Sequence, residues 1–320
     1  LLATLDGRQV ITVEDLESAD GSLHPVQQAM VDQHGSQCGF CTPGFVMSLF
    51  SMYHQPESRG GNPVERRQID EELAGNLCRC TGYAPIIRAA GQALANPGDD
   101  HFSLAEPEVS ALLNQIRRNE DLEISFGNRR YFAPVSIDSL CRLLETCPEA
   151  VMVAGATDVG LWITKQHRVM ETLIYLGQIA ELQALHVDQA AGLLEIGAGV
   201  SYSDAMVQLV ALYPDFRPLL SRLGAVQVRN AGTIGGNIAN GSPIGDMPPP
   251  LITLGARLVL RSARGVRNID LEDFFIDYGK QDLRAGEFLE KILLPLPEPD
   301  QWFRVYKLSK RFEQDISAVC

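Results

Sequence analysis

Four cysteines in two short motifs constrain this chain more than any other feature. Two residues separate Cys38 from Cys41, and one residue separates Cys78 from Cys80. Thiolates that a fold brings together hold a metal ion or an iron–sulfur cluster. Paired zinc ligands usually have about two to four residues between them, so the second pair fits zinc less well. The spacing favours an iron–sulfur cluster, although it matches neither common ferredoxin pattern, and it leaves zinc and disulfides open.

The remaining cysteines argue against a disulfide framework. The chain has seven cysteines, an odd number, and Cys141, Cys147 and Cys320 lie in apolar or helical contexts that are typical of buried free thiols. The sequence shows no signal peptide and no apolar run long enough to span a membrane. These features predict a cytoplasmic protein that does not bind a membrane.

The cysteine motifs are predicted to lie at junctions between short helices. Helices are expected from Pro25 to Gly35, after the N-cap Thr42, from Ile69 to Ala74, and from Pro85 to Leu94. Cys41 directly precedes the second of these helices, where the helix dipole favours a thiolate. The sequence therefore predicts four short helices around a site made of turns.

These motifs resemble those of a known family. Gln37-Cys-Gly-Phe-Cys-Thr-Pro-Gly44 together with Cys78-Arg-Cys-Thr-Gly-Tyr83 is similar to the helical 2Fe–2S domain of the molybdenum hydroxylases, which include xanthine dehydrogenase, aldehyde oxidase and carbon monoxide dehydrogenase. The resemblance implies that all four cysteines of the two motifs bind one 2Fe–2S cluster. The segment between the motifs is a few residues longer than the family pattern, and residues 58–63 are the predicted insertion.

Length and charge limit the organisation and the partners. A chain of 320 residues predicts two or three domains. The net charge of −13, without a basic stripe, argues against nucleic acid as a partner. Residues 97–128 are polar and are predicted to be a linker, with one helix around Leu112, Leu113 and Ile116.

The second half of the chain predicts an α+β domain. Strands are expected at 151–155, 172–176, 193–196 and 258–261, and a helix at 201–212. Gly197-Ala-Gly199 follows one strand, but Tyr202 stands where a dinucleotide fingerprint requires its third glycine. A Rossmann reading therefore fails.

Two other segments are better candidates for binding a ligand. Val153-Ala-Gly-Ala-Thr-Asp-Val159 is a strand-to-helix turn of small residues, and residues 231–246 place glycines among Thr, Asn and Ser. Small residues let a backbone approach a ligand, and successive N–H groups bind anions, although ordinary turns have the same composition. Both segments resemble the flavin-binding loops of the FAD domain in the molybdenum hydroxylases.

That resemblance implies a role for each matching position. The two loops would hold the FAD phosphates and ribose, Leu223 would approach the flavin ring, and Asp246 would bind near the adenine side. Ala156 departs from the glycine or asparagine that is common in the family. Tyr278, Lys310 and Arg311 would lie where NAD⁺ docks. The predicted FAD-binding residues are Val153, Ala154, Gly155, Ala156, Thr157, Asp158, Val159, Leu223, Thr233, Ile234, Gly235, Gly236, Asn237, Ser242, Asp246, Leu289 and Lys307.

The resulting fold class is a multidomain α and α+β protein. Residues 18–96 would form a four-helix 2Fe–2S domain, and residues 129–320 a vanillyl-alcohol-oxidase-type (PCMH-like) FAD domain without its C-terminal end. Residues 1–13 read as two strands and a turn, so residues 1–17 are expected to be the remnant of a β-grasp ferredoxin domain. Ile316–Cys320 is expected to begin a strand, and the sequence is interpreted as part of a longer protein.

Within the family, the order of the domains resembles the iron–sulfur and flavin subunit of bacterial xanthine dehydrogenases. This implies a molybdopterin-binding large subunit as partner, in a dimer of heterodimers, and electron flow from molybdopterin through 2Fe–2S clusters to FAD and NAD⁺. No residue of this chain would act as a general acid or base. The alternatives are a molybdenum hydroxylase for aldehydes or N-heterocycles, an oxidase that reduces oxygen, and a zinc-stabilised binding module.

Overall fold

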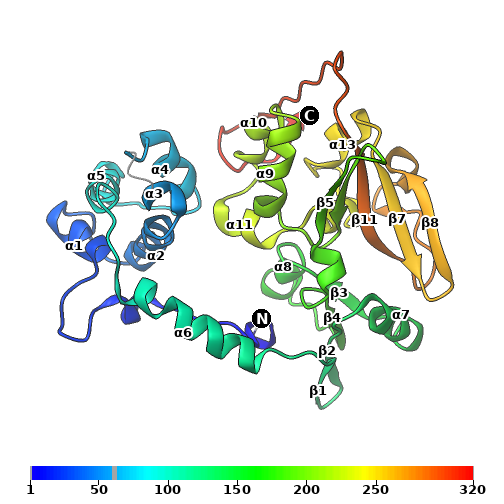
Figure 1. The fold of residues 1–320 in the computed structure, drawn as a ribbon, viewed down its shortest axis with the longest axis horizontal. Helices are drawn as coiled ribbons and strands as arrows, with labels where there is room; N and C mark the ends of the chain where they lie inside the picture. Colours follow the sequence, from blue (N-terminus) through cyan, green and yellow to red (C-terminus); the bar gives the residue numbers. More distant parts are fainter. Residues whose placement is uncertain (1, 60–62, 320) are drawn as a thin grey trace. The chain divides into compact units, whose positions relative to one another are not determined.

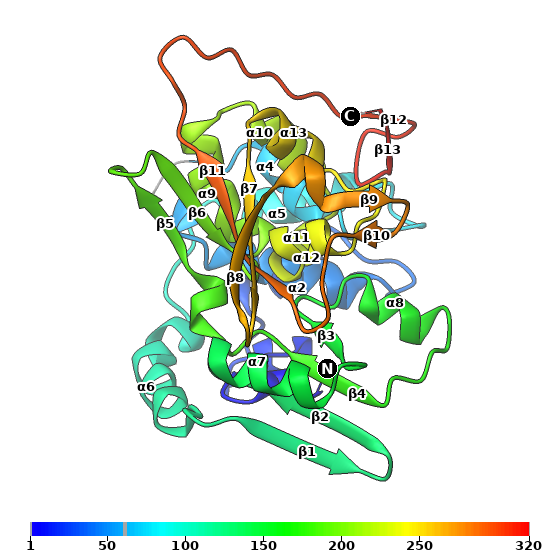
Figure 2. The same cartoon turned by 90° about the vertical axis from the view of Figure 1, so that its right-hand side faces the viewer.

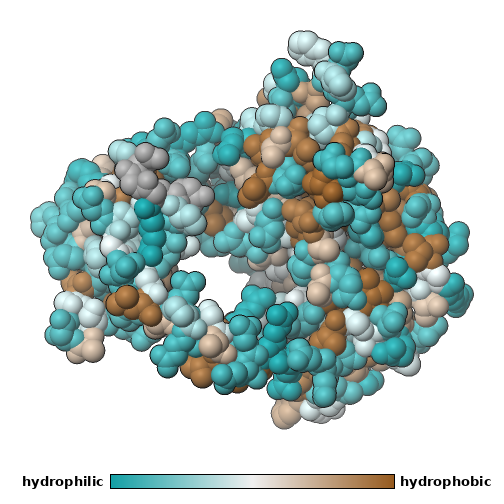
Figure 3. Space-filling view, in the orientation of Figure 1, coloured by the Kyte–Doolittle hydropathy of each residue, from teal (hydrophilic) through white to brown (hydrophobic). Residues whose placement is uncertain are grey.

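The computed structural model describes residues 2–59 and 63–319. It divides into two compact units, one ending at Arg118 and the other beginning at Asn119 (Figure 1). The boundary falls inside the predicted linker. Hydrophilic residues cover most of the face drawn in Figure 3, with apolar patches between them. Within the described ranges, no helix combines the length and the apolar character that crossing a membrane requires.

The first unit is helical. The helices predicted around the cysteine motifs are confirmed as α1, α2, α4 and α5, and α4 begins earlier than predicted because Glu65 and Gln68 form a capping box. The helical segments of this unit are η1 (Leu2–Leu5), η2 (Val13–Leu16), α1 (Pro25–Asp32), α2 (Thr42–Tyr53), α3 (Pro56–Arg59), α4 (Arg66–Leu73), α5 (Ala84–Ala93) and α6 (His101–Ile116).

The apolar faces of these helices form one core. Val26 of α1, Phe45 and Leu49 of α2, and Ile86 of α5 have no exposed surface. Burying each such side chain contributes about 1.5–3 kcal/mol to the stability of the unit. This core holds the turns between the helices, and therefore the cysteines, in place.

The expectation of strands in residues 1–13 is wrong. Residues 2–5 and 13–16 form the 3-10 segments η1 and η2, and Leu16 is fully buried in the helical core. Ile11 and Val13 also pack against that core. A β-strand needs a hydrogen-bonded neighbour, and the first unit has no strand in its described residues. Leu1 and residues 60–62 of the predicted insertion lie outside the described residues, and Ser58 and Arg59 belong to α3.

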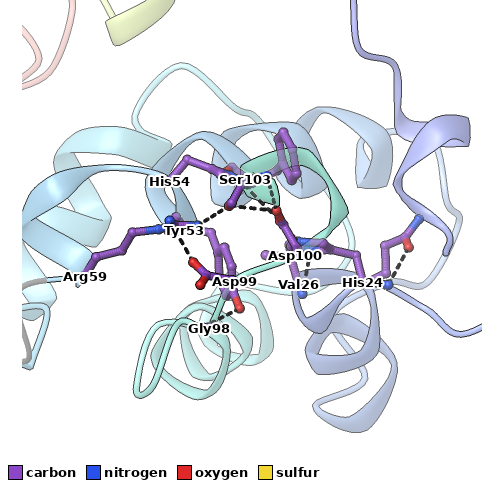
Figure 4. A network of polar contacts seen from close by, with 11 residues as sticks. His24, Val26, Tyr53, His54, Arg59, Gly98, Asp99, Asp100 and Ser103 are labelled. Atoms are coloured by element: carbon purple, nitrogen blue, oxygen red, sulfur yellow. Dashed lines mark hydrogen bonds and ion pairs between the residues drawn. The ribbon is translucent and has the colours of Figure 1, made fainter. Parts of the chain in front are cut away.

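A buried polar network connects the start of α6 to α1 and α2 (Figure 4). Asp100 caps α6 by accepting a hydrogen bond of 2.8 Å from the Ser103 N–H. Its Oδ2 lies 2.9 Å from Nε2 of both His24 and His54. The Nδ1 of His24 accepts a hydrogen bond from the Val26 N–H, so the network assigns the proton of a neutral His24 to Nε2.

Burial acts on the pKa of both Asp100 and His24. For Asp100, burial raises the pKa, but the hydrogen bonds from Ser103 and His24, together with the contact with His54, outweigh it and hold the pKa well below the usual range. For His24, burial lowers the pKa, and the contact with Asp100 opposes this only in part. Asp100 is therefore charged and His24 neutral near pH 7.

The second unit contains two main sheets. The smaller sheet has the order β1-β2-β4-β3, in which β1 and β2 are antiparallel and β4 is parallel to β2 and β3. Its strands are β1 (Leu122–Phe126), β2 (Arg129–Ala133), β3 (Val151–Val153) and β4 (Thr172–Tyr175), and α7 (Ile137–Thr146) packs its apolar side into the same core. Since α6 and β1 both lie within residues 97–128, most of the predicted linker is structured.

The larger sheet is antiparallel, with the order β5-β6-β11-β7-β8. Its strands are β5 (Leu185–Asp188), β6 (Leu193–Gly197), β7 (Arg257–Ser262), β8 (Gly265–Asp270) and β11 (Phe288–Pro295). Helices α9, α10 and α13 cover one face (Figures 1 and 2), and their apolar side chains share a core with β6, β7 and β11. This core positions the loops that follow β3 and precede α12.

The remaining elements of this unit are short. The strands predicted at 151–155, 172–176, 193–196 and 258–261 are confirmed as β3, β4, β6 and β7, although β3 ends at Val153. The helix predicted at 201–212 is confirmed as α9, which Ser201 caps. The predicted C-terminal strand is confirmed as β13, and Cys320 lies outside the described residues. The other elements are η3 (Ala180–Gln183), η4 (Leu271–Phe274), α8 (Val159–Thr164), α9 (Tyr202–Leu212), α10 (Phe216–Leu220), α11 (Val226–Ala231), α12 (Ile234–Ala239), α13 (Pro248–Thr253), β9 (Phe275–Asp277), β10 (Lys280–Gln281), β12 (Leu308–Ser309) and β13 (Ser317–Val319).

Candidate functional site

The four cysteines lie on two turns of the helical unit. Cys41 is the N-cap residue of α2, so the prediction of Thr42 as N-cap is wrong by one residue, and the second pair lies on the turn that leads into α5. Cys38 and Cys80 are exposed, Cys41 is half-buried and Cys78 is buried. Tyr83, the N-cap residue of α5, has a positive φ of 67° and its hydroxyl accepts a hydrogen bond of 3.0 Å from the Cys78 N–H. The Cys-x-Cys-Thr-Gly-Tyr motif therefore encodes the shape of this turn as well as its thiols.

Hydrogen bonds favour a thiolate at Cys78. The Thr81 hydroxyl lies 3.1 Å from its sulfur, and the N–H groups of Thr81 and Cys80 donate to that sulfur at 3.4 Å and 3.5 Å. The Thr81 hydroxyl, followed by the two N–H groups, lowers the pKa of Cys78 to about 7. Thr81 was not singled out from the sequence, although it stands in the second motif.

The thiols form two pairs. Cys38 contacts Cys80, and Cys41 contacts Cys78. The backbone N–H of Phe40 and the partner thiol lower the pKa of Cys38, whereas burial and then the contact with Cys78 raise that of Cys41. In the part of the chain that the structure describes, no group of three or more metal-binding side chains converges on one ion.

This arrangement fits a cluster of two irons. Each iron of a 2Fe–2S cluster with four cysteine ligands binds two thiolates, and the chain presents two thiol pairs whose protons iron would displace. The structure thus places together all four cysteines that the sequence predicted as ligands.

The two glycine-rich loops of the second unit meet. A Cβ atom added to Gly155 would lie 1.6 Å from the carbonyl oxygen of Ala231, so only glycine permits this approach. Asn240 Nδ2 donates a hydrogen bond of 2.9 Å to Asp158 Oδ2. The loop after β3 and the loop around α12, which are far apart in the sequence, therefore form one surface.

Ala156 occupies a strained position in the first loop. Its φ is +58°, a left-handed conformation that costs roughly 1–2 kcal/mol for a residue other than glycine or asparagine. This is the position at which the family often has those two residues. Alanine at this position therefore adds backbone strain that glycine would avoid.

The second loop is held by contacts that the sequence did not reveal. The N–H groups of Ile234 and Gly235 donate to the carbonyls of Val200 and Ala198, both at 3.1 Å. A Cβ atom on Gly235 would lie 2.5 Å from Ala198 Cα. The segment that failed as a dinucleotide fingerprint therefore supports the predicted flavin loop, and Thr233 caps α12 through the Gly236 N–H at 3.0 Å.

Asp246 and Lys307 form a buried ion pair. Each side chain belongs to a residue that is 7% exposed, and the Lys307 ammonium contacts Asp246 Oδ2. The Ser317 hydroxyl donates to Asp246 Oδ1 at 2.6 Å. A lone lysine on the surface is usually solvated, whereas the fold buries Lys307 against a carboxylate.

The other predicted site residues lie in different environments. Leu223 and Leu289 are both buried in the core of the second unit. Tyr278 is 83% exposed on the turn between β9 and β10, and Arg311 pairs with Asp315 at 3.2 Å. Ser242 accepts a hydrogen bond of 3.4 Å from the Ile244 N–H within its own loop.

Comparison with known families decides the class of the chain. Residues 12–91 match the 2Fe–2S binding domain family, and residues 124–297 match the family described as the FAD binding domain in molybdopterin dehydrogenase. The chain belongs to the molybdopterin dehydrogenase family. The first match contains the four cysteines and the second contains both glycine-rich loops, so 2Fe–2S and FAD are the cofactors of this molybdopterin dehydrogenase chain. Lys307 and Ser317 lie beyond the matched residues.

Curated relatives of this molybdopterin dehydrogenase chain are larger proteins. It is 30% identical to xanthine dehydrogenase 1 of Arabidopsis thaliana and 30% identical to xanthine dehydrogenase of Emericella nidulans, each over 99% of this chain. These matches cover 28% and 27% of the two relatives, so the chain spans about 28% of their length.

Solved structures of the family have the same fold. Quinoline 2-oxidoreductase from Pseudomonas putida 86 is similar with a TM-score of 0.53 and 27% identity, over 61% of this chain and 67% of that one. CO dehydrogenase from Oligotropha carboxidovorans gives a TM-score of 0.55 and 27% identity, over 61% and 68% of the two chains. The predicted combination of a helical 2Fe–2S domain and an α+β FAD domain is confirmed.

Proposed function

We propose that this oxidoreductase chain is the electron-transfer part of a xanthine dehydrogenase. It would pass electrons from a molybdopterin site on a partner subunit, where hypoxanthine and xanthine are oxidised to urate, through 2Fe–2S clusters to FAD and on to NAD⁺. The observation that carries the proposal is the match of 99% of the chain, across both redox domains, to xanthine dehydrogenases. Flavins suit this role because they accept electrons singly and release them as a pair.

The chain's own residues would position the cofactors and would transfer no protons. The Cys38–Cys80 and Cys41–Cys78 pairs would hold the cluster, and the thiol of Cys78, whose pKa is about 7, is readily deprotonated at neutral pH. The loops that meet at Gly155 and Ala231 would hold FAD through backbone groups. The other FAD-binding residues predicted from the sequence would also contact the cofactor.

The proposed partner is a molybdopterin-binding large subunit, in a dimer of heterodimers, in the cytoplasm. Phe40, which is 94% exposed between Cys38 and Cys41, marks the exposed side of the cluster site. Gln37 beside it is exposed as well and would face the pterin of the partner. NAD⁺ would dock near Tyr278, Lys310 and Arg311, which are exposed.

The test uses the full-length protein, purified with its partner. We expect flavin bands over a broad iron–sulfur absorption, and NAD⁺ reduction on addition of xanthine or hypoxanthine. A colourless protein that contains zinc would refute the electron-transfer role. A coloured protein that reduces oxygen and leaves NAD⁺ unchanged would refute only the choice of acceptor.

A second candidate is a molybdenum hydroxylase for aromatic N-heterocycles. The similarity to quinoline 2-oxidoreductase, at 27% identity, favours it. The same preparation distinguishes the two proposals. If quinoline reduces the cofactors of the protein and xanthine does not, the heterocycle hydroxylase is the correct proposal.

A further inference from the structure

Tyr202 is a buried residue to which the predicted flavin site assigns no role. It is the first residue of α9, is 5% exposed, and donates its backbone N–H to the Gly232 carbonyl at 3.0 Å. A Cβ atom on Gly232 would lie 2.8 Å from the ring atom Cε2 of Tyr202. The phenol ring therefore lies against the backbone of the second loop.

The first loop reaches the same backbone segment. A Cβ atom on Gly155 would lie 2.9 Å from the Gly232 nitrogen, as well as 1.6 Å from the Ala231 oxygen. The Tyr202 ring and the loop after β3 thus both contact the segment 231–232, where the two loops meet.

The Tyr202 phenol lies near carboxylates of both loops. Burial raises the pKa of Tyr202, and the carboxylates of Asp246 and Asp158 raise it further. Asp158 belongs to the first loop and Asp246 ends the second, and both have other partners, Asn240 for Asp158 and Lys307 for Asp246. The phenol is therefore neutral and keeps its proton to donate.

No described protein group accepts that proton. Every hydrogen bond of Tyr202 within residues 2–59 and 63–319 is made by its backbone, although the residue is more than nine-tenths buried. A phenol hydroxyl without a protein partner is available to donate a hydrogen bond to a ligand or a water molecule.

We propose that the Tyr202 hydroxyl donates a hydrogen bond to an oxygen of the FAD, on its diphosphate or its ribityl chain, and helps to hold the dinucleotide between the two loops. This proposal rests on the proposed flavin site. Both kinds of oxygen are acceptors, and a neutral donor avoids adding charge beside two carboxylates.

The test is the Tyr202→Phe variant of the full-length protein, prepared without flavin and titrated with FAD and with ADP. The variant keeps the ring against Gly232 and removes only the hydroxyl. We expect a rise in the FAD dissociation constant of roughly ten-fold or more, as for a lost hydrogen bond to a charged group. A parallel loss for ADP assigns the contact to the diphosphate, and a loss for FAD alone assigns it to the ribityl chain.

Tyr213→Phe is the matched control. Tyr213 is 3% exposed in the same unit, but its hydroxyl donates to the Pro295 carbonyl at 2.8 Å. This variant should lower the melting temperature and leave the FAD dissociation constant unchanged. Equal FAD affinities of wild type and Tyr202→Phe, with both proteins folded by circular dichroism, would overturn the Tyr202 proposal alone. A wild-type protein that fails to bind FAD would instead overturn the flavin site.

Discussion

At the residue scale, the environment of each cysteine determines its chemistry. Three groups donate hydrogen bonds to the Cys78 sulfur, whereas burial raises the pKa of Cys141 in the second unit. A lowered thiol pKa favours the thiolate that binds iron. Cys78 and Cys141, which are both buried, therefore differ: Cys78 is suited to the proposed ligand role, and Cys141 is a small apolar residue of the core.

The first prediction concerns Cys78→Ser. A serine hydroxyl is a poor substitute for a thiolate, so this variant should lose about two iron atoms per chain and the corresponding electron paramagnetic resonance signal. FAD content should stay at the wild-type level, because the flavin loops belong to the other unit.

Cys141→Ser is the control for this substitution. It also replaces a buried cysteine, but one on α7 in a core of the second unit. Iron content should be unchanged in this variant. An unchanged iron content in Cys78→Ser would remove Cys78 from the ligands.

At the element scale, one glycine decides whether the two flavin loops can meet. Gly155→Ala would place a methyl group 1.6 Å from the Ala231 oxygen, so the backbone would have to move. We expect a loss of about 1–3 kcal/mol in stability and a low FAD content, measured by absorbance and thermal unfolding.

Gly160→Ala is the matched control in α8. A Cβ atom there would meet nothing within 4 Å, and its φ is negative. Alanine should be neutral or stabilise the helix by about 0.5–1 kcal/mol. Full FAD content in both variants would contradict the close contact between the loops.

The attachment of α6 predicts a pH dependence. The unfolded chain takes up a proton on His24 below about pH 6.5 and on Asp100 below about pH 4, before the folded protein does, because both pKa values are lowered in the fold. Stability should therefore be complete above about pH 6.5 and fall as the pH decreases, first through His24 and then through Asp100. Thermal unfolding between pH 3 and 8 measures this decrease.

Asp100→Asn removes the negative charge of this side chain but keeps its ability to cap α6. Asparagine also caps helices, so the variant should lose about 1–3 kcal/mol at pH 7 and lack the second, more acidic step. Asp99→Asn is the control, since the Asp99 side chain is 72% exposed. If the more acidic decrease in stability persists in Asp100→Asn, other carboxyl groups cause it.

At the scale of the whole molecule, the two units carry cofactors of different kinds within one chain. The 2Fe–2S domain and the FAD domain follow each other in the sequence, and the chain spans 28% of the length of xanthine dehydrogenase 1 of Arabidopsis thaliana. The proposed electron transfer would take electrons from a partner subunit and pass them to NAD⁺. A substitution at the NAD⁺ surface can be recognised by comparing the rates of electron transfer to NAD⁺ and to an artificial dye.

Tyr278→Ala tests the proposed NAD⁺ surface. Tyr278 is 83% exposed, so its removal should leave the fold intact, whereas a lost aromatic contact should lower kcat/KM for NAD⁺ by about ten-fold. Reduction of an artificial dye should remain at the wild-type rate. Tyr306→Ala, at a residue that is 70% exposed, is the control. If Tyr278→Ala lowers the rates with NAD⁺ and with the dye equally, NAD⁺ does not dock at Tyr278.

The sequence by itself determined the helices around the cysteine motifs, the α+β class of the second unit and the two cofactors. These features depend on short-range patterns, namely caps, apolar periodicity and motifs such as the two cysteine pairs. The tertiary structure alone decided how the thiols pair, that Gly155 crosses Ala231, that Lys307 is buried against Asp246, and that Ile11, Val13 and Leu16 join a helical core. Each of these depends on contacts between residues far apart in the chain, which local propensity cannot encode.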